Sequence, residues 1–202
     1  MITLYHAPQS RSSRLVTLID ELQAPVEIKT VQIRRLGQET SGPDPKNPHP
    51  EGKVPFLTDG DSHIRESAAI ILYLTDKFPQ AGLGPLPGDA KRGEYLSWLF
   101  WYQGVVEPLL ICRYTGLTHP AFTSSWRDET AMADRLSEAL HKGPYLLGEH
   151  YSAADLLLHS PFAWMPAATP DRPEIRDWVA RCAARPSVAR TTAHDAEAMA
   201  GA

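Results

Sequence analysis

The chain contains little cysteine, and its cysteines do not form a recognisable site. Among its 202 residues there are two, Cys112 and Cys182. They match neither a CxxC motif nor the spacing of zinc ligands, and two cysteines are too few for a disulfide framework. The sequence therefore implies no metal site and favours the reducing environment of the cytoplasm.

The chain also lacks long apolar runs and an excess of basic charge. No stretch approaches the roughly 20 apolar residues that cross a bilayer, and residues 1–6 have neither the basic region nor the apolar stretch of a secretory signal. The net charge is −4, which argues against affinity for nucleic acid or an anionic membrane surface. We therefore expect no membrane partner and no nucleic-acid partner.

The beginning of the chain reads as strand, helix, strand. Residues 2–6 predict a short strand, and apolar residues recur at helical spacing over 12–23. Residues 26–31 alternate between apolar and polar types, as a half-buried strand does. A β-α-β unit of this kind implies that its two strands pair in parallel.

The next segments complete a small α/β domain. Residues 34–50 are polar and rich in Pro and Gly, which predicts a loop with a short irregular helix. Phe56-Leu57 and His63-Ile64 flank an Asp59-Gly60 turn and predict a hairpin. A helix is predicted over residues 67–78. This order of elements is that of a thioredoxin-like domain.

The second half of the chain shows helical patterns and no further strand. Residues 79–88 contain three Pro and three Gly and read as a linker. Helices are predicted over residues 89–115, 127–141, 152–165 and 172–184, and a short helix or frayed tail over 192–202. The fold class is therefore an α/β thioredoxin-like domain (1–79), a linker (80–88) and an all-α helical bundle domain (89–202).

A Val-Pro pair and a Glu-Ser pair flank the predicted hairpin. Proline at the start of a strand cannot donate to the sheet, and a cis Pro55 would leave the backbone of Val54 facing a ligand. Glu66 and Ser67 stand at a helix N-terminus, which offers free N–H groups and favours negative charge. Together these features predict a site for an extended peptide that carries a carboxylate.

These two motifs carry a resemblance to a family. Lys-Val-Pro-Phe-Leu at 53–57 and Glu-Ser-Ala-Ala-Ile-Ile-Leu-Tyr-Leu at 66–74 resemble the glutathione-binding signature of cytosolic glutathione S-transferases of bacterial type, with serine rather than cysteine in the N-terminal loop. The resemblance extends over nearly the whole chain. It implies a detoxifying transferase that conjugates glutathione, its co-substrate, to a small hydrophobic electrophile, without a metal and as a homodimer.

The resemblance also assigns glutathione contacts. The backbone of Val54 would pair with the cysteinyl unit and be held there by cis-Pro55. Glu66 would meet the ammonium group, and Ser67 the carboxylate, of the γ-glutamyl end. Lys53 would lie near the glycyl carboxylate. Read without the family, Lys53 is a solvated lysine, Ser67 an N-cap and Glu66 a partner of the helix dipole.

Serines and arginines follow the first predicted strand, at a βα junction where open α/β sheets place ligands. One serine is expected to cap the helix, while another could donate a hydrogen bond to a thiolate. By resemblance Ser10 is the activating hydroxyl, with Ser12, Ser13 and Tyr5 as alternatives. Arg11 would add positive charge or be simply exposed. Because the loop holds no cysteine, a thiol-disulfide role is less favoured.

The helical half would supply the electrophile pocket. By resemblance, the candidates for its lining are Tyr102, Val106, Arg113 and Trp164. A kink is predicted at Glu107-Pro108, because proline breaks the helical hydrogen bonds. Ser152 and Asp155 have the spacing of a capping box, with a role in folding rather than chemistry.

Two other functions share the same binding residues. One is a glutathione-dependent isomerase or reductive dehalogenase, which would differ only in the apolar pocket. The other is a non-catalytic glutathione-binding or interaction protein that keeps the fold. The position of Ser10 relative to the bound sulfur would separate this second reading from an enzyme.

Overall fold

The computed structural model describes residues 1–35, 37 and 42–200, and the chain divides into two compact units. The first, called here the sheet unit, comprises Met1–Ala81 together with Pro186–Ala202. The second, the helical unit, comprises Gly82–Arg185. None of the helices formed by the described residues is long and apolar enough to cross a membrane.

The sheet unit is built on a mixed sheet of four strands, in the order β2-β1-β3-β4. β1 pairs in parallel with β2, and β3 pairs antiparallel with β1 and β4. The predicted β-α-β unit and hairpin are both confirmed. The strands are β1 (Ile2–His6), β2 (Val26–Thr30), β3 (Phe56–Asp59) and β4 (Ser62–Arg65).

Two helices pack with the sheet because each has a strongly apolar side. α1 (Ser13–Leu22) buries residues such as Leu15, Leu18 and Leu22, which recur at helical spacing. α2 (Ser67–Lys77) packs on α1 and is followed by the short 3₁₀ helix η1 (Pro79–Ala81). The irregular helix expected within 34–50 is absent from the described part of that segment, and residues 36 and 38–41 lie outside the described residues.

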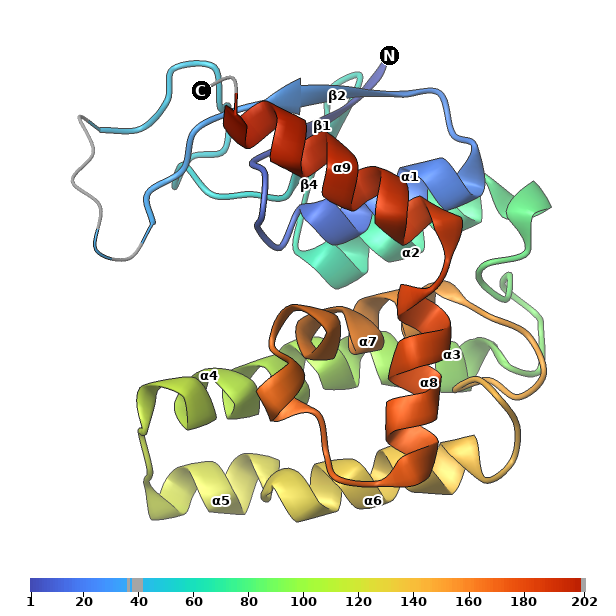
Figure 1. Ribbon diagram of the computed structural model, residues 1–202. Helices are drawn as coiled ribbons and strands as arrows, with labels where there is room; N and C mark the ends of the chain where they lie inside the picture. The colour runs from blue at the N-terminus through green and yellow to red at the C-terminus, as the bar shows by residue number, and fades with distance from the viewer. Residues whose placement is uncertain (36, 38–41, 201–202) are drawn as a thin grey trace. The chain divides into compact units, whose positions relative to one another are not determined.

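The C-terminal helix differs from the prediction. α9 (Pro186–Ala200) begins well before residue 192 and packs on α1 (Figure 1). The segment 89–202, expected to be one helical domain, is therefore divided between the two units. The α9–α1 contact is polar: the hydroxyl of Thr17 donates to that of Thr191 at 2.9 Å, and Arg190 Nη2 donates to Asp20 Oδ2 at 2.6 Å. Apolar periodicity does not detect such an interface.

The helical unit contains the four predicted helices, with two differences. The first of these helices, predicted over residues 89–115, is interrupted by a π-helical stretch, η2 (Tyr102–Val106). Pro108 has no N–H to donate to the carbonyl group four residues before it, and a widened turn accommodates that loss. A helix not predicted, α5, begins at Pro120. The remaining elements are α3 (Arg92–Trp101), α4 (Glu107–Thr115), α5 (Pro120–Trp126), α6 (Glu129–Leu140), α7 (Ala153–Trp164), η3 (Pro166–Ala168) and α8 (Pro173–Ala183).

Asp155 is the polar centre of the helical unit, and the predicted capping box is confirmed. Its carboxylate accepts from the N–H and hydroxyl of Ser152 at 2.9 and 2.8 Å, and from Leu146 N–H and Trp178 Nε1–H at 2.9 Å each. Burial raises the pKa of Asp155, and these hydrogen bonds oppose the rise. One side chain thus joins the start of α7 to the preceding loop and to α8.

Replacing Asp155 by Ala should destabilise the protein strongly. Four buried donors would lose their acceptor, which predicts a loss of roughly 3–5 kcal/mol in the free energy of unfolding. Urea unfolding measures this loss. Glutathione affinity of the remaining folded protein should be unchanged, and a fall in affinity with normal unfolding would contradict a purely structural role.

Asp128 provides a matched control for Asp155. It caps α6 by accepting from the N–H of Ala131 at 2.8 Å, at an exposed position. Asp128→Ala therefore removes one solvent-accessible cap and should lower the free energy of unfolding by only about 1 kcal/mol. Equal losses in the two variants would show that burial of the Asp155 network adds nothing.

Candidate functional site

The register of the sheet brings three loop segments to one end of the sheet unit. Tyr5 pairs with Phe56, and Phe56 pairs with Arg65. Because the pairings are antiparallel, the end of β1, the start of β3 and the end of β4 meet at the same end of the sheet. The loop between β1 and α1 (residues 7–12), called here the serine loop, is therefore a neighbour of the Val54-Pro55 and Glu66-Ser67 pairs. In the sequence, Ser10 and Ser67 are 57 positions apart.

The Val54-Pro55 peptide bond is cis, as predicted. Val54 lies just outside β3 and is only half-buried, and among the described residues its N–H and C=O have no backbone partner. The preceding carbonyl, of Lys53, accepts from the side chain of buried Asn47 at 3.2 Å. The loop is thus held on one side while the backbone of Val54 stays available to an extended peptide.

Glu66 has an unusual backbone conformation at the start of α2. Its φ is +69° and its ψ is 128°, a region that residues with a side chain rarely adopt and that costs about 1–3 kcal/mol. Glu66, rather than Ser67, occupies the N-cap position and makes no side-chain cap. Ser67 is buried in the first turn. Backbone strain of this kind gathers at binding sites, where it fixes the direction of a side chain.

Lys53 is exposed, and its ammonium group pairs with the carboxylate of Glu51. The hydrogen bond from Lys53 is also the main cause that lowers the pKa of Glu51. An exposed pair of this type contributes little to stability and can open to admit another anion. The arrangement is compatible with both readings of Lys53, as a solvated lysine or as a contact for a carboxylate.

The serine loop forms a chain of hydroxyl groups that leads inward. Ser10 is half-buried, and its Oγ lies 2.7 Å from Ser12 Oγ and 2.7 Å from the carbonyl of Ala7, to which it can donate. The N–H of Ser12 donates to Ser10 Oγ at 3.1 Å. Ser12 occupies the N-cap position of α1, but its hydroxyl caps nothing there. It is fully buried, so of these two hydroxyls only that of Ser10 reaches the loop surface.

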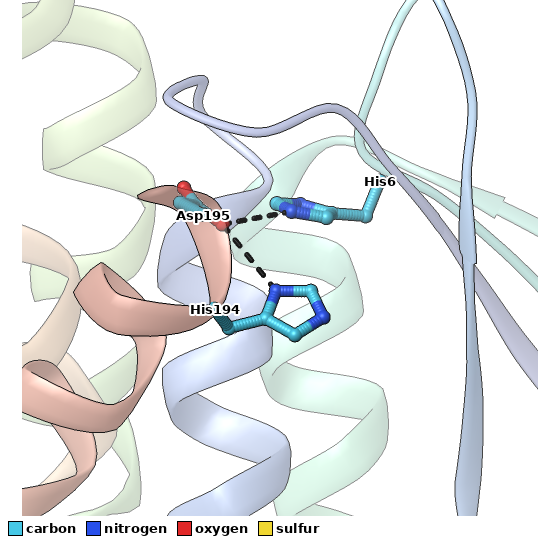
Figure 2. Close-up of side chains that lie close together, drawn as sticks. All are labelled: His6, His194 and Asp195. Atoms are coloured by element: carbon cyan, nitrogen blue, oxygen red, sulfur yellow. Dashed lines mark hydrogen bonds and ion pairs between the residues drawn. The ribbon is translucent and has the colours of Figure 1, made fainter. Parts of the chain in front are cut away.

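The inner end of this chain is a histidine bound to a carboxylate. Ser12 Oγ lies 2.8 Å from His6 Nδ1, and His6 Nε2 lies 3.0 Å from Asp195 Oδ1. Figure 2 shows His6 and Asp195 facing each other, with Asp195 on α9 and the exposed ring of His194 beside them. The other oxygen of Asp195 accepts from the N–H of Gln9 at 2.7 Å and from the hydroxyl of Ser13 at 2.6 Å.

Asp195 is ionised at any ordinary pH. Burial disfavours its charge, but the hydrogen bonds from His6, Ser13 and Gln9 outweigh burial and lower its pKa from 3.8 to about 2. Histidine and aspartate also occur in metal sites, and the possible ligand atoms of His6, His194 and Asp195 lie within 4.8 Å of one another. Here Asp195 already accepts hydrogen bonds from three donors, which would compete with a metal ion for its oxygens.

The other candidates near the serine loop are less well placed. Tyr5 is half-buried, with its ring packed against Phe56 at a centroid distance of 5.9 Å. The hydroxyl of Ser13 is directed to Asp195. Arg11 is exposed on the loop surface. Ser10 is therefore the hydroxyl that best combines access with hydrogen bonding.

The residues proposed for an electrophile pocket differ in their exposure within the helical unit. Tyr102 and Val106 are buried, whereas Trp164 is 71% exposed at the end of α7. Arg113 pairs with Glu129. Of the four, Arg113 lines a cavity of about 190 Å³ in this unit, together with Leu110, Tyr114, Met165, Ala167 and Ala168.

His6 and Asp195 were not singled out by sequence reasoning. His6 has a usable signal, because it is the last residue of a strand at a βα junction, where ligands bind. Asp195 has none, since it lies 189 positions away in a helix with little apolar character. Only the docking of α9 on α1 reveals it.

The depressed pKa of Asp195 predicts a pH-dependent contribution to stability. The stabilisation is complete above the ordinary pKa of 3.8 and is lost as the pH falls through about 2. Asp195→Asn should therefore be less stable than the wild type by about 2 kcal/mol at neutral pH, and the gap should shrink by roughly half near pH 3. Urea unfolding at both pH values measures it, and a gap independent of pH would contradict the assignment.

Comparisons with known proteins identify the family of the chain. The family models described as "Glutathione S-transferase, N-terminal domain" and "Glutathione S-transferase, C-terminal domain" match residues 4–82 and 124–186. Glutathione S-transferase F10 of Arabidopsis thaliana is 30% identical over 175 residues, which cover 80% of each chain. The disulfide-bond oxidoreductase YfcG of Escherichia coli is 28% identical and covers 93% of this chain and 92% of its own. A sphingomonad glutathione S-transferase solved with glutathione shares the fold, with a TM-score of 0.74, 22% identity and coverage of 96% and 98%. The chain belongs to the glutathione S-transferase family.

Proposed function

We propose that this protein binds glutathione at the loop end of its sheet unit and conjugates the sulfur to a small hydrophobic electrophile. The observation that carries the proposal is the register of the sheet, which brings Ser10, Val54 and Glu66 to one end. Each of these three sites offers a different kind of contact. The reaction would be nucleophilic substitution or addition by the thiolate.

The contacts match the chemical groups of glutathione. The backbone of Val54 would pair with the cysteinyl unit, since its N–H and C=O lack backbone partners among the described residues. The first turn of α2, with Ser67, would bind the γ-glutamyl carboxylate through N–H groups and the helix dipole. Glu66 would bind the ammonium group and Lys53 the glycyl carboxylate.

The thiol would be activated by Ser10. A thiol with a pKa near 8.5 is only a few per cent ionised at neutral pH. A hydroxyl donor beside a helix N-terminus lowers that pKa by about one unit or more, so that a large fraction becomes thiolate. Holding the electrophile beside the sulfur would supply the rest of the rate acceleration through proximity. Arg11 would add positive charge at the loop surface.

The remaining partner assignments are also proposals. We propose that the electrophile is held by residues of the helical unit, among them the candidates Tyr102, Val106, Arg113 and Trp164. Phe100, 63% exposed on α3, is a large apolar side chain that a second copy of the chain could cover, which supports a homodimer. The sedimentation coefficient measures the oligomeric state. We also propose that the protein is located in the cytoplasm.

Reduction of disulfides is the competing function, because two relatives from Escherichia coli, YfcG and YghU, carry the name of a disulfide-bond oxidoreductase. Such chemistry usually passes through a protein cysteine, and the serine loop of this chain has none. The two functions are separable by assay. Turnover of a disulfide substrate with no conjugation of any electrophile tested would favour the reductase.

Ser10→Ala should abolish activation but not binding. In the wild type the ultraviolet absorbance of bound glutathione should show a thiol pKa at least about one unit below that of free glutathione. In Ser10→Ala the thiol pKa should return to the free value, while the dissociation constant changes little. Ser10→Thr keeps a hydroxyl and serves as the control, with the low pKa retained. A low pKa in Ser10→Ala would disprove the role of Ser10.

Glu66→Gly should separate stability from binding. Glycine accepts a positive φ without strain, so the free energy of unfolding should rise by about 1 kcal/mol. The same change removes the carboxylate for the ammonium group, and glutathione affinity should fall at least about tenfold. Glu66→Ala is the matched control, with the same loss of affinity and no gain in stability. Unchanged affinity in both variants would remove Glu66 from the site.

A further inference from the structure

An unbroken row of hydrogen bonds joins Ser10 to the C-terminal helix. Its steps are Ser10 Oγ to Ser12 Oγ at 2.7 Å, Ser12 Oγ to His6 Nδ1 at 2.8 Å, and His6 Nε2 to Asp195 Oδ1 at 3.0 Å. Three of these four residues are buried. The proposed function uses only the outermost hydroxyl and leaves a buried histidine–carboxylate pair unexplained.

We infer that His6, held by Asp195, accepts the proton that the glutathione thiol loses, and that Ser12 and Ser10 relay it. The inference rests on the proposed function, in which Ser10 meets the sulfur. His6 is then a proton acceptor that acts through two hydroxyls, and Asp195 is a positioning residue. Neither of them touches the substrate.

Before the transfer the row points inward. Asp195 is ionised, so His6 donates its Nε2–H to the carboxylate and presents Nδ1 as an acceptor. The hydroxyl of Ser12 donates to Nδ1, and the hydroxyl of Ser10 donates to Ser12 Oγ. The oxygen of Ser10 therefore has a lone pair free to accept the S–H of a bound thiol.

The transfer reverses the two hydrogen bonds that join Ser10, Ser12 and His6, while His6 Nε2–H donates to Asp195 throughout. The S–H bond breaks and its proton joins Ser10 Oγ, the former Ser10 proton passes to Ser12, and the former Ser12 proton forms an N–H bond at His6 Nδ1. One proton has then moved from sulfur to imidazole, and no other reactant is needed. In the final state the Ser10 hydroxyl donates to the thiolate, as activation requires.

The surrounding hydrogen bonds suit both directions. Ser12 Oγ accepts the N–H of Ala7 at 3.1 Å in either state, and Ser10 Oγ accepts the N–H of Ser12 at 3.1 Å. Each oxygen thus keeps one backbone N–H donor in both states. In its other two hydrogen bonds, it changes from acceptor to donor in one and from donor to acceptor in the other. The carbonyl of Ala7 lies 2.7 Å from Ser10 Oγ and 3.2 Å from Ser12 Oγ and competes for their protons, so the relay requires both hydroxyls to turn away from it.

A carboxylate contacts the inner nitrogen of the His6 ring, with Nε2 3.0 Å from Asp195 Oδ1. Asp195 is 7% exposed on its side chain and carries a full negative charge. Among the described residues, His194 on α9 also faces the pair, with a ring-centroid distance of 5.8 Å from His6 and a side chain that is 45% exposed. Within the loop, Arg35 donates to the carbonyl of Gln9 at 3.1 Å. The carboxylate is the nearest charge to His6 and the one that a buried imidazolium needs.

Breaking the row at two different points tests the inference. Ser12→Ala removes the link between Ser10 and His6, and Asp195→Asn removes the charge that stabilises the imidazolium. In both, the thiol pKa of bound glutathione should rise by about one unit or more, and kcat/KM at neutral pH should fall about tenfold. Ser12→Thr restores a hydroxyl and should restore both values.

Arg190→Gln is the matched control for α9. Arg190 pairs with Asp20 at 2.6 Å and helps to dock α9 on α1, but it stands outside the row. The thiol pKa of glutathione bound to Arg190→Gln should equal that of glutathione bound to the wild type. This should hold even if the melting temperature of Arg190→Gln falls as far as that of Asp195→Asn. Should Ser12→Ala fail to fold, the comparison of Asp195→Asn with Arg190→Gln decides the question.

The outcomes separate this inference from the proposed function. If Ser10→Ala loses the low thiol pKa while Ser12→Ala and Asp195→Asn keep it, the relay is wrong and the transferase proposal stands. If the wild type binds no glutathione, or binds it with an unshifted thiol pKa, the proposed function itself fails. An equal rise in Arg190→Gln would overturn the relay, because loosening α9 would then be sufficient.

Discussion

The hydrogen bond between His6 and Asp195 is the contact that positions the loop carrying Ser10 in the sheet unit. It joins the first strand to the last helix, 189 positions apart. The same carboxylate holds Gln9 and Ser13, so the serine loop is anchored from two sides. Placement of Ser10, and with it the proposed activation of glutathione, follows from that anchor.

Burial gives this contact its strength. A carboxylate that is almost fully removed from water needs donors for its oxygens, and Asp195 has three. Asp155 has the same role in the helical unit, where one carboxylate receives four donors. In each unit a buried acid fixes the position of loops that apolar packing alone would leave loosely specified.

Sequence reasoning reached the parts of the fold that follow local rules. Apolar periodicity predicted α1, and the capping box at Ser152 and Asp155 predicted the start of α7. Apolar periodicity could not predict the start or the packing of α9, because the buried residues of this helix are Ser187, Thr191 and Asp195. The motif residues Val54 and Glu66 were predicted from the Val-Pro and Glu-Ser pairs, which can be recognised in the sequence. The role of His6 depends on a partner that only tertiary packing supplies.

The fate of the thiol proton is the most direct test of the account. We would titrate the protein with glutathione at neutral pH in buffers of different ionisation enthalpy, and measure by calorimetry the protons released. Ultraviolet absorbance of the same samples gives the amount of thiolate formed. The account predicts that thiolate forms with almost no net release of protons, because His6 keeps them. Release of one proton for each thiolate formed would contradict it.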